Sequence, residues 1–424
     1  MSVAIAFFVL LFLGVPVALV LLGAAIWFAV DFGNLGILAA FPGSFYAGME
    51  SFELLSIPLF ILLGEVMTVG GLTRHLFGTG ARLLGRLPRR LAFVVLASNF
   101  FLAAIMGSAN AQVAVMTPAV LPEMERAGYR RRFAAALTAG ASLLGPIVPP
   151  SMVFIIYAVV AEVSIGTMFM AGILPGLILA GGIALVILVS DAFEPGVDHE
   201  RESNVDATTK AGITPILGAM TVPLVIVGSI LGGFATPTES AAIAVVVALV
   251  VVWLFFEPVR FAALGGMLVR TATNTAIVLT LIAAVRVFSY ILTFYHVPDI
   301  ASRILVEFSS SPLVFMLLVF VLVLIIGAFM DGLAAIVVLV PILLPVATGE
   351  FGISPIVFGV VFCMTAVVGL ITPPVGTVLF IAAALSGESV ARLSWALLPY
   401  VLVGVASVLL IIFVPSIALV FSSG

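Results

Sequence analysis

Two pairs of adjacent prolines interrupt long apolar stretches of this chain. Pro149-Pro150 lies within residues 133–161, and Pro373-Pro374 lies within residues 354–385. Proline lacks a backbone donor and clashes with the preceding helical turn, so each pair leaves several carbonyl groups without intrahelical partners. In hydrocarbon such carbonyls are tolerated only where protein, water or a bound ion satisfies them. The two pairs therefore predict two broken membrane helices that line a site.

The composition places these breaks in a membrane. Of 424 residues, 63% are hydrophobic and 8% are charged, and the mean hydropathy is +1.39. An ordinary soluble domain has about 25% charged residues. The apolar residues come in blocks of roughly 20 to 30, which is the length of a membrane helix, whereas an outer-membrane barrel shows alternation over roughly ten-residue segments. We therefore expect an all-α polytopic membrane protein.

A second kind of interruption precedes each proline pair. Residues 91–124 are largely apolar apart from the small polar patch at residues 107–110, and arginines flank the stretch on both sides. Because arginine favours the cytoplasmic side of a membrane, a single crossing would leave one cluster outside. A re-entrant helical hairpin with its tip at the patch keeps both clusters inside. Residues 312–347, interrupted near Asp331, predict a second hairpin.

The same landmarks recur in both halves at a nearly constant spacing. Gly107 and Gly327 are 220 residues apart, and Gly145 and Gly369 are 224 residues apart. Helix counting places the ends of the first hairpin inside and those of the second outside, so the halves are expected to be inverted repeats. Inverted repeats with broken helices near the midplane are typical of secondary transporters.

We predict a first repeat over residues 1–190, a cytoplasmic linker over 191–211 and a second repeat over 212–424. The expected parts of the first repeat are scaffold helices within 1–72, the hairpin 91–124, the broken helix 133–161 and a helix over 166–190. The expected parts of the second are scaffold helices within 212–295, the hairpin 312–347, the broken helix 354–385 and a helix over 395–421.

Charge sets the expected orientation. Residues 2–30 predict a first membrane helix that bends near Gly14 and Pro16, and residues 31–52 contain no Lys or Arg, which suits the outer side. The arginine-rich loop over residues 74–90 is then cytoplasmic by the positive-inside rule. The N-terminus is therefore expected in the cytoplasm and the C-terminus on the outer side.

The scaffold of the second half is expected to contain three helices. They lie near residues 213–231, 239–256 and 271–295, with Arg260 and Arg270 in the loop between the last two. Thr236-Pro237-Thr238-Glu239 is typical of a capping box with proline at the first helical position, and we interpret it as mainly structural.

Each hairpin tip, together with the break of its own half, offers oxygen ligands for a hard cation such as Na⁺. The first candidate substrate and ion site comprises Gly107, Ser108, Asn110, Gly145, Val148, Pro149, Pro150 and Ser151, with Ser108, Gly145, Val148 and Pro150 as Na⁺ ligands. The second comprises Gly327, Asp331, Gly369, Thr372, Pro373 and Gly376, with Gly327, Gly369, Thr372 and Gly376 as Na⁺ ligands. The alternative is that these small residues only permit close helix packing.

Two further charged residues lie within or near apolar segments. Glu65 is expected either in a helix-end or arginine-paired role or in a transport role. Arg286, inside residues 271–295, is expected either to attract an anionic substrate or to pair with a carboxylate on another helix. Ionisable groups at such positions need a partner or water, because insertion of an arginine costs about 2.5–3.5 kcal/mol.

Other functions find no support in the sequence. The single cysteine, Cys363, excludes an internal disulfide, and three scattered histidines do not predict a metal cluster. The net charge is −4 and no basic run suits nucleic acid. The motifs of nucleophile elbows, zinc proteases and P-loops are absent, so neither an enzyme nor an organic cofactor is expected. Transport energy must then come from an ion gradient or from another subunit.

With these residues identified, the chain resembles the large membrane subunit of a tripartite ATP-independent periplasmic (TRAP) transporter over nearly its whole length. The segments that carry the resemblance are 56–65, the tip at 107–108, 129–136, 149–151, 169–175, 236–239, 329–331 and 371–376. Two features depart from the family pattern as we know it. Asn110-Ala111-Gln112 is bulkier and more polar than the usual tip, and Arg286 stands where a small residue is expected.

The resemblance implies an elevator-type, Na⁺-coupled importer in the bacterial inner membrane, where the C-terminus would be periplasmic. It implies three partners besides membrane lipids: a small four-helix membrane subunit encoded as a separate chain, a periplasmic substrate-binding protein, and an organic acid substrate. The substrate class would be a carboxylate or dicarboxylate, sialic-acid-like compounds included. The alternative is a stand-alone ion-coupled carboxylate or anion transporter, or a channel, without a binding protein.

Overall fold

The computed structural model describes residues 6–422, apart from positions 8, 11, 12, 51, 72–88, 190–213, 257–260 and 310. Within the described residues all regular elements are helices, and six of them are long and apolar enough to cross a membrane. The predicted all-α membrane fold is confirmed. The predicted linker over residues 191–211 and most of the arginine-rich loop lie outside the described residues.

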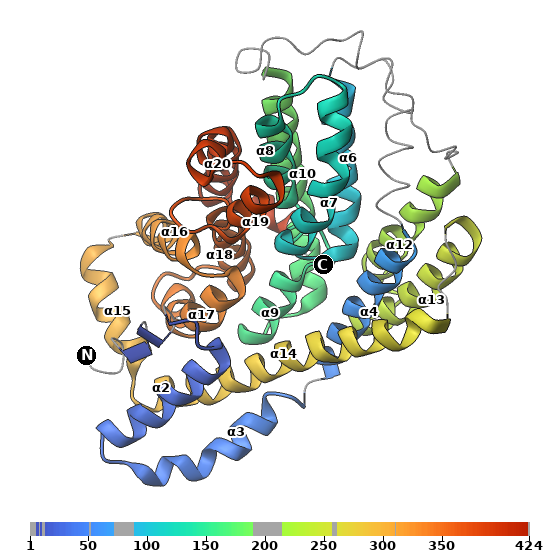
Figure 1. Cartoon of the computed structure of the whole chain (residues 1–424). Helices are drawn as coiled ribbons and strands as arrows, with labels where there is room; N and C mark the ends of the chain where they lie inside the picture. Colours follow the sequence, from blue (N-terminus) through green and yellow to red (C-terminus); the bar gives the residue numbers. More distant parts are fainter. Residues whose placement is uncertain are drawn as a thin grey trace.

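One group of helices gathers around the long helix α14, which runs along the lower side of the molecule in Figure 1 and contacts α2, α3 and α4. With 34 residues α14 is about 51 Å long, well above the roughly 30 Å of a bilayer core. This group, called the scaffold below, comprises α2 (Val17–Asp31), η1 (Leu35–Ala40), α3 (Phe41–Ala47), η2 (Phe52–Leu55), α4 (Ser56–Val69), α12 (Thr214–Leu231), α13 (Pro237–Phe255), α14 (Phe261–Phe294) and α15 (Val297–Phe308).

The remaining helices form a second group, called the core below. Its part from the first half comprises α6 (Arg90–Met106), α7 (Ala109–Arg126), α8 (Arg131–Ser142), α9 (Met152–Val160) and α10 (Ile165–Val189). Its part from the second half comprises α16 (Pro312–Phe329), α17 (Gly332–Gly349), α18 (Pro355–Gly369), α19 (Thr377–Ser386), α20 (Val390–Phe413) and α21 (Ser416–Leu419). In each half, two helices joined at a tip are followed by two helices separated by a proline-containing break.

The two halves of the core pack through corresponding pairs of helices. α6 and α7 pack against α8, and α16 and α17 pack against α18. Across the halves, α7 packs against α19 and α17 packs against α9, while α8 packs against α20 and α18 against α10. Each hairpin therefore lies on the broken helix of its own half and reaches the far part of the other one. This arrangement brings both tips and both breaks into the centre of the core.

Two stretches for which no helix was predicted are helical. Residues 31–52 contain η1 and α3, because α3 covers an apolar face of α14. The stretch after residue 295 forms α15, which packs against α17. The placement of Arg270 in a loop was wrong, because α14 begins at Phe261 and Arg270 pairs with Glu65 within the helical region. Arg260 lies outside the described residues.

The membrane helix predicted over residues 2–30 is divided. Leu13 and Gly14 form a turn, and α2 begins at Val17 directly after Pro16. Gly14 has a φ of 79°, which glycine adopts without the steric cost of a β-carbon. The predicted bend near Gly14 and Pro16 is thus a full interruption of the helix.

Candidate functional site

The tip of the first hairpin is a two-residue turn that lies against the first break. Gly107 ends α6 with a φ of 60°, and the hydroxyl oxygen of Ser108 caps α7 by accepting a hydrogen bond from the Ala111 amide at 3.4 Å. A β-carbon placed on Gly107 would lie 3.3 Å from the carbonyl oxygen of Pro150 and 3.3 Å from the amide nitrogen of Met152. Glycine is therefore required here both for the left-handed backbone and for the close approach.

The first break, between α8 and α9, is buried along its whole length. Ser151 caps α9, and its hydroxyl group donates a hydrogen bond to the carbonyl oxygen of Pro146. Within the described residues, the carbonyl oxygens of Gly145, Val148 and Pro150 accept no backbone hydrogen bond. Carbonyl groups without backbone partners are unfavourable in a buried break unless a side chain, water or a bound ion satisfies them.

A fully buried glutamine stands beside this break. The Nε2 atom of Gln112 donates to the backbone carbonyl oxygen of Asn99 at 2.6 Å and to Asn99 Oδ1 at 2.8 Å. The Gln112 Oε1 atom accepts no hydrogen bond from the described residues, and it would lie 2.5 Å from a β-carbon placed on Gly145. The sequence marked Gln112 only as bulky, because its orientation depends on a residue on the other arm of the hairpin.

The second tip packs against the second break through two glycines. A β-carbon on Gly369 would lie 2.5 Å from the carbonyl carbon and 2.7 Å from the Cα atom of Gly327. At the other end of the break, the Gly376 amide donates to the carbonyl oxygen of Ala328 at 3.0 Å, and a β-carbon on Gly376 would lie 2.9 Å from the carbonyl oxygen of Thr372. The four predicted ligand residues of the second site therefore cluster around this tip.

The two breaks differ in exposure. Pro149 and Pro150 are buried, whereas Pro373 and its neighbour Pro374 are exposed and Thr372 is intermediate. Both Pro–Pro peptide bonds are cis. The proline pair of the second break is thus exposed, and that of the first break is buried.

Asn110 joins the two hairpins. Its Nδ2 atom donates to Asp331 Oδ2 at 3.2 Å, and its Oδ1 atom accepts a hydrogen bond from the Thr377 hydroxyl group at 2.9 Å. Asp331 Oδ1 accepts a further hydrogen bond from the Leu333 amide at 2.9 Å, which caps α17. The sequence grouped Asn110 with the first site, but its hydrogen-bond partners Asp331 and Thr377 belong to the second half. Their separations of 221 and 267 residues carry no local pattern from which the contacts could be predicted.

These contacts bring the N-terminal ends of α7, α17 and α19 together. Asn110 lies in the first turn of α7, Asp331 caps α17, and Thr377 begins α19. A helix N-terminus presents free amide groups and the positive end of the helix dipole, so it favours negative charge. The meeting point of the three helices is therefore suited to negative charge, and the Asp331 carboxylate lies there.

A cavity of about 360 Å³ lies between the first tip and the scaffold. Ser108 and Pro150 line it from the core, and α4 and α14 line it from the scaffold. Thr68 and Asn274 contribute polar groups to the scaffold side. Neither residue was singled out from the sequence, because one polar residue in an apolar helix forms no motif.

Glu65 also lines this cavity, and it is paired. Its Oε2 atom lies 2.8 Å from the Nε and 2.8 Å from the Nη2 atom of Arg270, so the pair joins α4 to α14 within the scaffold. The pairing with an arginine is present in this conformation, and a transport role for Glu65 stays a prediction.

Arg286 does not reach the tips. Its Nη1 atom lies 2.5 Å from Oε1 of Glu162, which follows the C-terminal end of α9, so the pair connects scaffold to core. Both side chains line a separate cavity of about 550 Å³. The pairing with a carboxylate is present in this conformation, and a role of Arg286 in attracting an anionic substrate stays a prediction.

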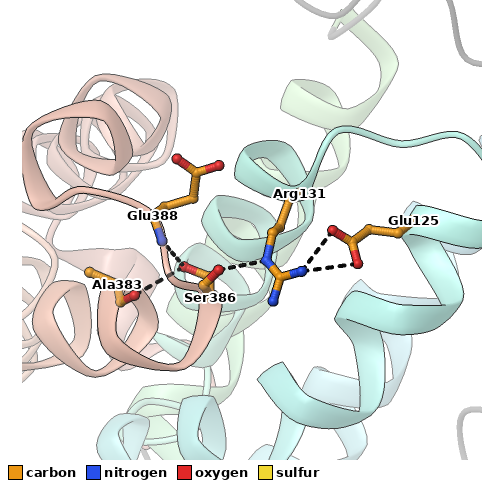
Figure 2. A network of polar contacts seen from close by, with 5 residues as sticks. All are labelled: Glu125, Arg131, Ala383, Ser386 and Glu388. Atoms are coloured by element: carbon orange, nitrogen blue, oxygen red, sulfur yellow. Dashed lines mark hydrogen bonds and ion pairs between the residues drawn. The ribbon is translucent and has the colours of Figure 1, made fainter.

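A polar network fastens the far end of the core, as Figure 2 shows. The Nε atom of Arg131, at the start of α8, donates to the carbonyl oxygen of Ser386 at 2.5 Å, and its Nη1 atom donates to Glu125 Oε1 at 3.1 Å. Ser386 in turn accepts a hydrogen bond from the Glu388 amide. Because these residues come from α7, α8 and the end of α19, the network ties the two halves of the core together.

The described residues contain no typical metal-binding cluster of side chains. In the part of the chain that the structure describes, no group of three or more His, Cys, Asp or Glu side chains could hold a metal ion. Cation ligands at the core would therefore be backbone carbonyl, hydroxyl and amide oxygens, which suit a weakly charged hard cation.

Paired hairpins and broken helices that meet at the centre of a polytopic α-helical protein define a class of secondary transporters. Residues 4–417 match the family model described as "Tripartite ATP-independent periplasmic transporter, DctM component". The chain belongs to this family, so it is a multi-pass membrane protein and a large TRAP transporter subunit.

Relatives from several bacteria are similar over most of the chain. The large permease protein YiaN of the 2,3-diketo-L-gulonate TRAP transporter of Escherichia coli is 32% identical over 96% of this chain and 94% of its own. The sialic acid large permease protein SiaM of Vibrio cholerae is 31% identical over 88% of this chain and 86% of its own. The isethionate permease protein DctMQ of Oleidesulfovibrio alaskensis is 34% identical over 98% of this chain, which spans only 65% of that relative. These relatives are transporter proteins and not enzymes, as predicted.

A solved structure shares the fold. The crystal structure of the Alcanivorax borkumensis YdaH transporter aligns with a TM-score of 0.65 and 17% identity, covering 91% of this chain and 89% of that one. The similarity concerns the arrangement of helices.

Proposed function

We propose that this chain is the membrane-translocating subunit of a Na⁺-coupled importer of small organic acids, which a periplasmic binding protein delivers. The observation that carries the proposal is the meeting of both hairpin tips and both breaks at the centre of the core, where Asn110 bonds to Asp331 and Thr377. Such a centre, shared by two halves, allows the coupling ions and the substrate to move together.

The cation sites lie at the two breaks. In the first, Ser108 at the tip and the carbonyl oxygens of Gly145, Val148 and Pro150 bind Na⁺, supported by the lack of backbone partners for these carbonyls among the described residues. In the second, the ligands come from Gly327, Gly369, Thr372 and Gly376, supported by the close packing of these residues around the tip. The Gln112 oxygen without a partner beside the first break fits a bound cation there.

An organic acid is the expected substrate class. The N-terminal ends of three helices meet beside Asn110 and favour a carboxylate or another anionic group. The cavity of about 360 Å³ between the tip and the scaffold offers space for a small molecule. The relatives named for 2,3-diketo-L-gulonate, sialic acid and isethionate all carry acids in their names, which agrees with this class.

Transport follows an elevator mechanism in which the core moves against the scaffold. Support comes from the division of the ion pairs: Glu65–Arg270 lies within the scaffold, and Arg286–Glu162 spans scaffold and core. The ion pair within the scaffold persists when the core moves, whereas the ion pair between scaffold and core must break. The two halves act as inverted repeats, with the N-terminus in the cytoplasm and the C-terminus in the periplasm of the inner membrane.

A small membrane subunit is a partner in this proposal. The name of the DctMQ relative, together with the 65% of its length that this chain spans, supports a second component that is fused there. Membrane lipids and this subunit cover the scaffold.

Reconstitution tests the function. The chain is placed in liposomes with its small subunit, and uptake of labelled organic acids is measured under an inward Na⁺ gradient with the binding protein outside. Uptake is expected only when both Na⁺ and the binding protein are present. Uptake that requires neither of them, or conductance without a gradient, would contradict the proposal and favour a stand-alone transporter or a channel.

A further inference from the structure

The amide oxygen of Gln112 is an unexplained polar atom at the centre of the core. Gln112 is 0% exposed, and its Oε1 atom accepts no hydrogen bond from the residues that the structure describes. Leaving an acceptor buried and unpaired is costly, so such an atom in a native protein needs an explanation such as a water molecule, an ion or local strain. The surroundings of Oε1 show which kind of partner fits.

The orientation of the Gln112 amide is fixed by Asn99. Asn99 Nδ2 donates to the Val95 carbonyl oxygen at 2.8 Å, so Asn99 Oδ1 faces Gln112 as an acceptor. The backbone carbonyl oxygen of Asn99 is a second acceptor on the same side. Exchanging the oxygen and nitrogen of Gln112 would set an oxygen against two oxygens, so Nε2 must face Asn99. Oε1 is therefore held away from Asn99.

Oε1 points at the first break. Around the position that a β-carbon would take on Gly145, Oε1 lies at 2.5 Å, the carbonyl carbon of Ser108 at 3.2 Å and the carbonyl oxygen of Ser142 at 3.2 Å. The amide oxygen of Gln112 therefore lies close to both the hairpin tip and the break. Gly145 leaves room for it, because any side chain there would collide with Oε1.

The local chemistry favours a cation over water or an anion. Several carbonyl oxygens of the break accept no backbone hydrogen bond within the described residues, and those of Gly145, Val148 and Pro150 are among them. Oε1 is a further oxygen acceptor without a donor among these residues. One water molecule has two hydrogens to donate, and an anion would be repelled by acceptor oxygens. A hard cation, in contrast, is bound by several oxygen ligands at once.

We propose that the Gln112 amide oxygen is a ligand of the cation at the first break, in addition to the oxygens of the tip and the break. This inference rests on the proposed function, because it assigns a further ligand to one of its cation sites. It also gives a role to the bulky polar tip of this chain, because Gln112 adds a side-chain oxygen to the backbone oxygens of the site.

The test is a Na⁺ titration of the purified full-length chain in lipid nanodiscs, with thermal stability as the readout and with K⁺ keeping the ionic strength constant. Substrate is left out, so the readout does not depend on transport. Gln112→Met keeps the size of the side chain and removes the oxygen. We expect the midpoint of Na⁺ stabilisation to rise about tenfold, or roughly 1.4 kcal/mol in binding free energy. The melting temperature without Na⁺ should also fall, because the variant loses the hydrogen bonds from Nε2 to Asn99, so the midpoint and not the melting temperature is the readout.

Two further variants separate binding from structure. Asn99→Leu removes one of the two acceptors that orient Gln112, so it should raise the midpoint in the same direction by a smaller factor. Thr117→Val is the matched control, because Thr117 lies on α7, is 0% exposed and has a hydroxyl group without a partner among the described residues. It is about 7.5 Å further along the helix, and its midpoint should equal that of the wild type.

The outcomes are distinct. A wild-type midpoint in both Gln112→Met and Asn99→Leu would overturn the inference while leaving Na⁺ binding intact. If Gln112→Met does not fold, the midpoint of Asn99→Leu decides alone. No Na⁺ stabilisation of the wild type would instead contradict the proposed coupling ion itself.

Discussion

Replacing Gly369 by alanine tests the contact between the second tip and the second break. The new β-carbon would lie 2.5 Å from the carbonyl carbon, 2.7 Å from the Cα atom and 2.8 Å from the carbonyl oxygen of Gly327. These are backbone atoms that no rotamer change can move. Ordinary contact begins at 3.4 Å, so the tip must retreat from the broken helix by about 0.9 Å.

The expected energetic and functional costs follow from this displacement. Overpacking of a filled site costs about 1–3 kcal/mol of folding free energy. A misplacement of about 1 Å at a functional site can cost on the order of 100-fold in rate. We expect Gly369→Ala to insert into the membrane, to melt a few degrees lower, and to lose Na⁺-driven uptake by about 10- to 100-fold.

Uptake in proteoliposomes and thermal melting measure the two effects, with Gly349→Ala as the matched control. Gly349 ends α17 on the same hairpin, and a β-carbon there meets nothing within 4 Å. The control should keep wild-type uptake and melt at the same temperature or slightly higher, because alanine favours the helix. Uptake by Gly369→Ala within twofold of the control would refute the idea that the tip must sit directly on the break.

Three further predictions concern the polar contacts. Asn110→Leu removes the link to Asp331, so thermal or chemical unfolding should show a loss of about 1–3 kcal/mol and uptake should fall sharply; unchanged uptake would show that the link is dispensable. Arg286→Glu should change stability by less than about 1 kcal/mol, because the pair is half-exposed, yet alter the uptake rate, and Glu162→Arg in the same chain should restore that rate if the pair connects moving bodies. Arg131→Ala should lower the melting temperature equally with and without Na⁺, whereas a loss of stabilisation seen only with Na⁺ would place Arg131 at a cation site.

The helices of the core could be predicted from the sequence because their boundaries are set by local chemistry. Gly107 and Ser108 end one helix and begin the next, and Ser151 caps the helix after the first proline pair. Helix α15 escaped prediction because it is short and charged, and only its packing against α17 shows why it forms. The start of α14 was missed because Arg270 resembled a loop residue until its pairing with Glu65 was known.

The site was less accessible to sequence reasoning. The tips and breaks could be grouped within each half, because repeated spacing marks them. The hydrogen bond from Asn110 to Asp331 joins residues that are 221 positions apart, and no sequence pattern in either segment predicts this contact. The direction of the Gln112 oxygen depends on Asn99, on the opposite arm of the hairpin. Such properties arise from side-chain geometry in the folded core, which composition and periodicity do not contain.

Counting the sodium ions bound by the purified chain tests the central claim, which is that each tip and break form one cation site. Equilibrium dialysis against radioactive Na⁺ in a K⁺ buffer measures this number directly. We predict two ions per wild-type chain and one in the folded variant that carries Pro149→Ala and Pro150→Ala, because an unbroken helix uses its own carbonyl groups. Fewer than two ions in the wild type, or an unchanged count in the folded variant, would contradict the account.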